Sequence, residues 1–161
     1  MERRDLLRGA VCGGIASLVA GPLAEPEMLA QPEVAPFELE ELTIAELQSG
    51  MQSGRFTARS LAESYLTRIS EIDRRGPALR SVLETNPDAL AIADALDRER
   101  REKGPRGPLH GIPVLVKDNL DTADRMTTTA GSFALEGSIP VQDSTVAKKL
   151  RALSADTRLN S

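Results

Sequence analysis

The sequence predicts an α/β fold that is rich in helices. Segments with helix-capping residues and apolar positions at helical spacing come first, and short apolar runs typical of strands alternate with further helices after them. Hydrophobic residues make up 40% and charged residues 27% of the 161 residues, which is close to the averages of globular proteins. The length fits one ordinary domain.

Residues 1–30 are interpreted as an export signal. The pair Arg3-Arg4 precedes an uncharged stretch of 16 residues, 9–24, and this order resembles a twin-arginine signal. At 16 residues this stretch is shorter than the roughly 20 that a membrane-spanning helix needs, and its four glycines and one proline make it weakly apolar. We therefore expect an exported protein, periplasmic or extracellular. The alternative is a buried helix rich in Ala and Gly in a cytoplasmic protein.

Two capped helices are predicted after this signal. Residues 31–41 are rich in Pro and Glu and are predicted to be a linker. Thr43 and Glu46 form a capping-box pattern, which predicts a short helix ending near Gln52. Thr57 is expected to cap a second helix, because apolar residues recur at three- and four-residue intervals after it.

The next segments combine an extended and a helical pattern. Residues 79–85 are predicted to form a strand. Asn86-Pro87 is a typical helix start, with Asn as the cap and Pro at the first helical position. The charged end of this third helix, residues 97–103, is interpreted as a solvated face.

The rest of the chain is predicted to be loop, strand and a last helix. Residues 104–113 are rich in Gly and Pro and are predicted to be a loop. Residues 114–116, Val-Leu-Val, are apolar throughout and suit a strand that is buried on both faces. Asp143 or Ser144 is expected to cap the last helix.

Lys117 is the chemically unusual residue, because it directly follows the apolar run and stands beside Asp118 and Asn119. Desolvation at the end of a buried strand would favour the neutral amine, which is the form of lysine that accepts a proton. The alternative is that Lys117 emerges into water at the strand end. Spacing alone does not decide between the two.

A longer pattern surrounds this lysine. Gly107-Pro108-Leu109, Gly111-Ile112-Pro113, Lys117-Asp118-Asn119 and residues 128–132 follow one another in an order that resembles the lysine-bearing motif of the amidase signature family. Upstream segments resemble the N-terminal part of bacterial peptide amidases in that family. The resemblance covers residues 37–152, so residues 42–152 are expected to be the N-terminal part of an amidase domain.

This resemblance implies hydrolysis of an amide or peptide-amide bond through a Ser–cis-Ser–Lys triad. The implied fold is a mixed sheet flanked by helices, of which this chain would hold an N-terminal, helix-rich fragment. Lys117 would be the catalytic lysine. Five other residues match the motif without an assigned chemical step, and Ser132 is not the family's nucleophile; the five are Asp118, Asn119, Thr129, Gly131 and Ser132.

The two serines of the triad belong to a later Gly/Ser-rich segment of the family, which this sequence does not contain. Residues 153–161 depart from the family pattern, so we interpret the tail as a frameshift that truncates the product; the alternative is a natural ending. We therefore expect the chain alone to be inactive. Two further alternatives stay open. The chain is either a catalytically inactive remnant that binds a partner, or a subunit that a C-terminal amidase part complements.

Composition excludes several other classes of function. Aromatic residues make up only 2% and the net charge is −4, so no nucleic-acid partner is expected. One Cys and one His exclude a zinc site of the usual Cys/His type within one chain, and no cofactor motif is recognised. The single histidine, His110, is interpreted as a structural loop residue rather than a base. Cys12 lies in the predicted signal.

Overall fold

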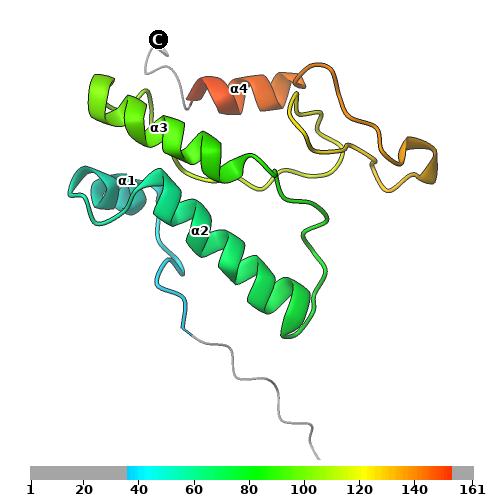
Figure 1. Cartoon of the computed structure of the whole chain (residues 1–161), viewed down its shortest axis with the longest axis horizontal. Coiled ribbons are helices and arrows are strands. Elements are labelled where there is room, and N and C mark those ends of the chain that lie inside the picture. Colours follow the sequence, from blue (N-terminus) through cyan, green and yellow to red (C-terminus); the bar gives the residue numbers. More distant parts are fainter. Residues whose placement is uncertain (1–35, 154–161) are drawn as a thin grey trace, which may run out of the picture. The chain divides into compact units, whose positions relative to one another are not determined.

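The structure is a computed structural model, which describes residues 36–153. The predictions for the export signal, and for the tail beyond residue 153, lie outside the described residues. Within this range the chain is rich in helices, as predicted (Figure 1). Its elements are α1 (Ile44–Gln52), α2 (Ala58–Arg68), the π-helical continuation η2 (Ile69–Arg75), α3 (Ala89–Lys103), the short 3₁₀ turn η3 (Phe133–Leu135) and α4 (Thr145–Leu153).

Side-chain caps start the first two helices where the sequence predicts them. At α1, the Thr43 hydroxyl accepts a hydrogen bond from the Glu46 amide at 3.2 Å, and the Glu46 carboxylate accepts one from the Thr43 amide at 2.8 Å. Thr57 and Ser60 form the equivalent reciprocal pair at α2. The predicted capping box is therefore confirmed at α1, and Thr57 caps α2 as expected.

The core lies between α1, α2 and α3. Leu61 on α2 is fully buried, with Leu47 from α1 and Ala93 from α3 beside it in the same cluster. Two residues that the composition places in a linker also contribute. Leu39 is buried in this cluster, and the Phe37 ring packs edge-on against the ring of Tyr65 with centroids 5.4 Å apart.

The charged end of α3 corrects one expectation, because it is not simply a solvated face. Asp97 is only 9% exposed, and its carboxylate accepts hydrogen bonds from the backbone amides of Ala58 at 2.7 Å and Arg59 at 3.0 Å. Those amides belong to the first turn of α2, where backbone amides have no carbonyl acceptor within the helix. Asp97 therefore caps α2 from a different helix, and α3 docks through it.

Arg100, one turn further along α3, also faces inward. Its guanidinium donates to the Gln48 side chain on α1 at 2.6 Å and to the backbone oxygen of His110 at 3.0 Å. Gln48 donates to the same His110 oxygen at 3.1 Å. The loop at residues 104–113 is thus held against α1 and α3 by polar contacts that only the folded chain brings together.

The remaining helix starts agree with the sequence to within two residues. The predicted start of α3 at Pro87, with Asn86 as its cap, is two residues too early, because Asn86 accepts the Asp88 amide at 2.8 Å in a turn that precedes the helix. The cap position is Asp88, and α3 begins at Ala89. At α4 the Ser144 hydroxyl accepts from the Ala147 amide at 3.2 Å. Of the two caps considered for the last helix, Ser144 makes the contact.

No strand forms among residues 36–153, which differs from the expectation for residues 79–85 and 114–116. Both segments are extended and exposed rather than buried: Leu83 is 69% and Leu115 is 73% exposed. A strand exists only where a neighbour completes its hydrogen-bond ladder, and the described residues offer these segments no such neighbour. Within the same range, no helix is long and apolar enough to cross a membrane.

Replacing Asp97 by Ala should destabilise the helical core. The substitution leaves two amides at the start of α2 without an acceptor in a buried position, and the loss of a helix cap costs about 1–2 kcal/mol. We expect a clear fall in the thermal unfolding midpoint, followed by circular dichroism at 222 nm. Glu102→Ala, at an exposed site on the same helix, is the matched control. Equal midpoints for the two variants would show that Asp97 does not anchor α2.

Candidate functional site

Lys117 lies on a cleft that is formed by three segments far apart in the sequence. The cleft has a volume of about 580 Å³, and most of its lining comes from residues 81–84, 115–120, 126–127 and 130–131. The Lys117 side chain is exposed. The described residues therefore do not supply the desolvation that the apolar run before Lys117 was expected to provide.

Asp118, next to this lysine, holds residues 127–131, hereafter the threonine segment. Its carboxylate accepts hydrogen bonds from the Thr129 amide at 2.9 Å and from the Thr129 hydroxyl at 2.5 Å. The backbone oxygen of Asp118 accepts from the Ala130 amide at 2.9 Å. The Thr129 hydroxyl, and then the Thr129 amide, lower the pKa of the Asp118 carboxyl, because they stabilise its ionised form.

Glu84 makes an equivalent contact at the other end of the threonine segment. Its carboxylate accepts from the Thr127 amide at 2.8 Å and from the Thr127 hydroxyl at 2.7 Å. Sequence reasoning missed Glu84, since nothing local connects residues 84 and 127. The alternation of Thr127 and Thr129 is a signal that could have suggested two acceptors on one side of an extended segment.

The other motif residues differ in how they relate to the cleft. Gly131 has a φ of +73°, a conformation that favours glycine, and its amide donates to the Thr129 hydroxyl at 3.2 Å. Ser132 is exposed, and its amide donates to the backbone oxygen of Thr129 at 2.8 Å. Asn119 is exposed on the cleft lining. The structure thus brings Asp118, Thr129 and Gly131 into direct contact.

The glycine-rich loop before the lysine is fixed by His110 and Gly111. His110 is fully buried; its Nδ1 accepts from the Arg106 amide at 3.1 Å, and its Nε2 lies 3.0 Å from the backbone oxygen of Leu96. Both ring nitrogens are engaged, which fits a structural role. Gly111 has a φ of +81°, and a Cβ there would come within 2.9 Å of the Ala58 Cβ on α2, so this position of the loop favours glycine.

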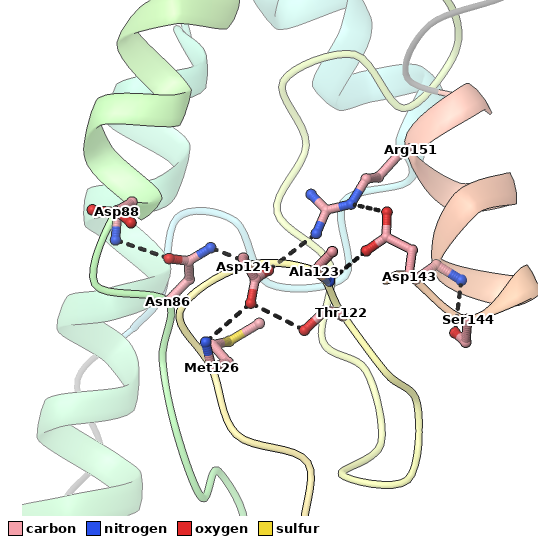
Figure 2. A network of polar contacts seen from close by, with 10 residues as sticks. Asn86, Asp88, Thr122, Ala123, Asp124, Met126, Asp143, Ser144 and Arg151 are labelled. Atoms are coloured by element: carbon pink, nitrogen blue, oxygen red, sulfur yellow. Dashed lines mark hydrogen bonds and ion pairs between the residues drawn. The ribbon is translucent and has the colours of Figure 1, made fainter. Parts of the chain in front are cut away.

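A polar network includes two residues that also line the cleft, Thr122 and Met126 (Figure 2). Arg151 on α4 donates to Asp143 at 2.9 Å and to Asp124 at 3.0 Å, and Asp124 also accepts from Asn86 at 3.4 Å. Burial alone would lower the pKa of Arg151, but the hydrogen bonds to the two carboxylates raise it overall. Residues 121–126 are thereby tied both to the start of α3 and to α4. Across residues 36–153, no group of side chains has the composition of a metal site.

Known proteins resemble this chain over most of the described residues. A family model described as Amidase matches residues 60–156. The chain is 45% identical over 124 residues to a putative amidase of Schizosaccharomyces pombe, covering 77% of this chain and 21% of that protein. It is 46% identical over 117 residues to a probable amidase of Arabidopsis thaliana, covering 71% of this chain and 22% of that protein.

Solved structures give the same result. The native peptide amidase from Stenotrophomonas maltophilia matches with a TM-score of 0.70 and 48% identity, over 75% of this chain and 24% of that chain. This protein therefore spans between about a fifth and a quarter of the length of the relatives that it matches.

The contact between Asp118 and the threonine segment should weaken in acid. The pKa of Asp118 is lower in the folded chain than in the unfolded chain. The ionised carboxylate therefore stabilises the folded chain fully at pH values above the unfolded-state pKa of about 3.9. This stabilisation is lost as the pH falls through the folded-state pKa. The proton chemical shift of the Thr129 amide should therefore be flat from pH 7 to 5 and titrate only below about pH 4. Asp118→Asn should abolish that titration. A midpoint above the unfolded value would contradict the assigned hydrogen bonds.

Proposed function

Since this chain belongs to the amidase family, we propose that it carries the lysine base of an amide hydrolase, with the two serines of the triad supplied by polypeptide outside these 161 residues. The observation that carries the proposal is the position of Lys117. It stands on a cleft, and the residue beside it is fixed by three hydrogen bonds to the threonine segment. A base must be held in a fixed place before it can accept a proton from a defined neighbour.

In this mechanism the neutral amine of Lys117 accepts a proton from a bridging serine, which accepts the proton of the nucleophilic serine. The nucleophile attacks the amide carbon, the C–N bond breaks, and the amine leaves with a proton. Water then hydrolyses the acyl-enzyme and releases the acid. Within this chain Lys117 moves the proton, whereas Asp118 and Thr129 hold its surroundings.

The proposed substrate is a small amide or the C-terminal amide of a peptide. The likeness to a peptide amidase in both sequence and structure supports this class. The cleft is open on the side where Lys117 and Leu115 are exposed, so a complementing amidase part has access to the lysine. The reaction needs no cofactor.

A second function is favoured by the exposed apolar side chains. Both backbone edges of residues 114–116 make no hydrogen bond to the described residues, and Leu79, Leu83 and Leu115 are exposed, which are features of a strand-pairing site. An inactive remnant that binds a partner through these edges would need no serines. The two functions differ in whether the Lys117 side chain is required, since only the hydrolase uses it as a base.

The purified 161-residue chain should release no ammonia from a peptide amide. Refolding it with the segment of the Stenotrophomonas maltophilia peptide amidase that lies beyond the matched part should restore hydrolysis. Lys117→Ala should then lower kcat by at least about a hundredfold, because a general base contributes that much or more. Lys149→Ala, at an exposed lysine on α4, is the matched control.

Two results would count against this proposal. Hydrolysis by the chain alone that is lost in Lys117→Ala would show that no complementing part is needed. Restored hydrolysis that survives Lys117→Ala would remove the lysine from the mechanism.

We also propose that the chain is exported through the arginine pair at residues 3 and 4, to the periplasm or the outside of the cell. A twin-arginine signal is recognised by its receptor through that pair. Replacing both with lysine should reduce the exported fraction of a full-length chain at least about tenfold in a bacterial host with this pathway. Arg8→Lys should export normally. Equal export of the two variants would contradict the proposal.

A further inference from the structure

Glu84 occupies a place in the site that the proposed mechanism does not explain. It belongs to the extended segment at residues 79–85, yet its carboxylate accepts both the amide and the hydroxyl of Thr127, at 2.8 Å and 2.7 Å. The two residues are 43 positions apart in the sequence. Both donors from Thr127 converge on one oxygen, Oε2 of Glu84, and two charge-assisted hydrogen bonds hold that atom more firmly than one would.

The segment that bears Glu84 is itself fixed from the helical core. Asp73 in η2 is buried, and its carboxylate accepts from the amide and hydroxyl of Ser81, each at 2.6 Å, and from the Val82 amide at 3.2 Å. The Ser81 hydroxyl, together with these amides, lowers the pKa of Asp73. Glu84 therefore projects from a segment that is anchored to the end of α2.

The threonine segment passes this restraint on to the lysine. Glu84 holds it at Thr127, and Asp118 holds it at Thr129, two residues further along. Between them, the Thr128 amide donates to the backbone oxygen of Ser138 at 2.9 Å. Because Asp118 directly follows Lys117, the position of the lysine depends on a segment whose other end Glu84 holds.

We propose that Glu84 is a positioning residue for Lys117, acting through Thr127 and through the contact between Thr129 and Asp118. The proposal deepens the proposed function and rests on the role of Lys117 as the base. Glu84 is exposed, so water solvates the Thr127 amide when the carboxylate is removed, and the helical core is unaffected. The effect of its loss is then local order at the lysine rather than the stability of the chain.

The test compares Glu84→Ala and Glu84→Gln in the 161-residue chain, with Glu136→Ala as the matched control. Glu136 is exposed in the same region, and no side-chain contact of it forms part of the site. Amide exchange at Thr127, Thr129 and Ala130 is followed by NMR, as are the Cε and Nζ chemical shifts of Lys117. Lys103 and Lys149 serve as internal references.

We expect exchange at all three amides to be at least about tenfold faster in Glu84→Ala, with an unchanged thermal midpoint. The Lys117 shifts should change in the same variant, whereas those of the reference lysines stay constant. Glu84→Gln should restore most of the protection, because its amide oxygen accepts the same two donors. Glu136→Ala should leave every measurement unchanged.

Three outcomes would overturn the proposal. Faster exchange at Thr127 alone, with Thr129 and Lys117 unaffected, would reduce Glu84 to a local contact. A lowered thermal midpoint with all lysines shifted would make its role one of general stability. Fast exchange of the threonine segment in the unsubstituted chain would mean that the contact is absent. None of these readouts requires hydrolysis, so a failed reconstitution would remove the proposed function and leave this result standing.

Discussion

The carboxylate of Asp97 at the start of α2 is the contact on which the rest of the described structure depends. It joins two helices that are separated by 20 residues of non-helical and π-helical chain, and it supplies the acceptors that the first turn of α2 lacks. With α2 fixed against α3, the continuation η2 places Asp73 where it can hold the next extended segment. The cleft begins at that segment.

The same kind of contact, a carboxylate that accepts several hydrogen bonds from another segment, recurs between the helical core and Lys117. Asp73, Glu84 and Asp118 each accept two or more donors from another segment, whose donor residue lies 8, 43 and 11 positions away respectively. Hydrogen bonds to a charged acceptor are stronger than those between neutral groups, so a few of them order extended chain that has no sheet to join. The buried carboxylates of Asp73 and of Asp97, the contact between α2 and α3, contribute to the stability of the chain. The exposed carboxylate of Glu84 sets local order instead, because water can replace it at little cost.

The sequence predicted those features whose causes lie within a few residues. The capping pair of Thr43 and Glu46 is local and is found where expected, and the local Asn86 turn places the start of α3 within two residues. The motif around Lys117 indicated the family for the same reason. Asp97 was misread because its partners lie 38 and 39 residues away. A charged run gives no sign of which member turns inward, and no local pattern assigns Glu84 to Thr127.

The apolar runs were misjudged for a different physical reason, which bears on the proposed chemistry. Their composition suits burial, yet Val114 is 50% and Leu115 is 73% exposed, and the lysine that follows them is exposed as well. A polypeptide that paired with residues 114–116 would cover this run and, with it, the stem of Lys117. The covering that completes the fold would therefore also exclude water from the cleft around Lys117. On the proposed mechanism, the pairing that completes the fold would also close the cleft around Lys117, while the contacts of Glu84 and Asp118 with the threonine segment hold the chain beside the lysine.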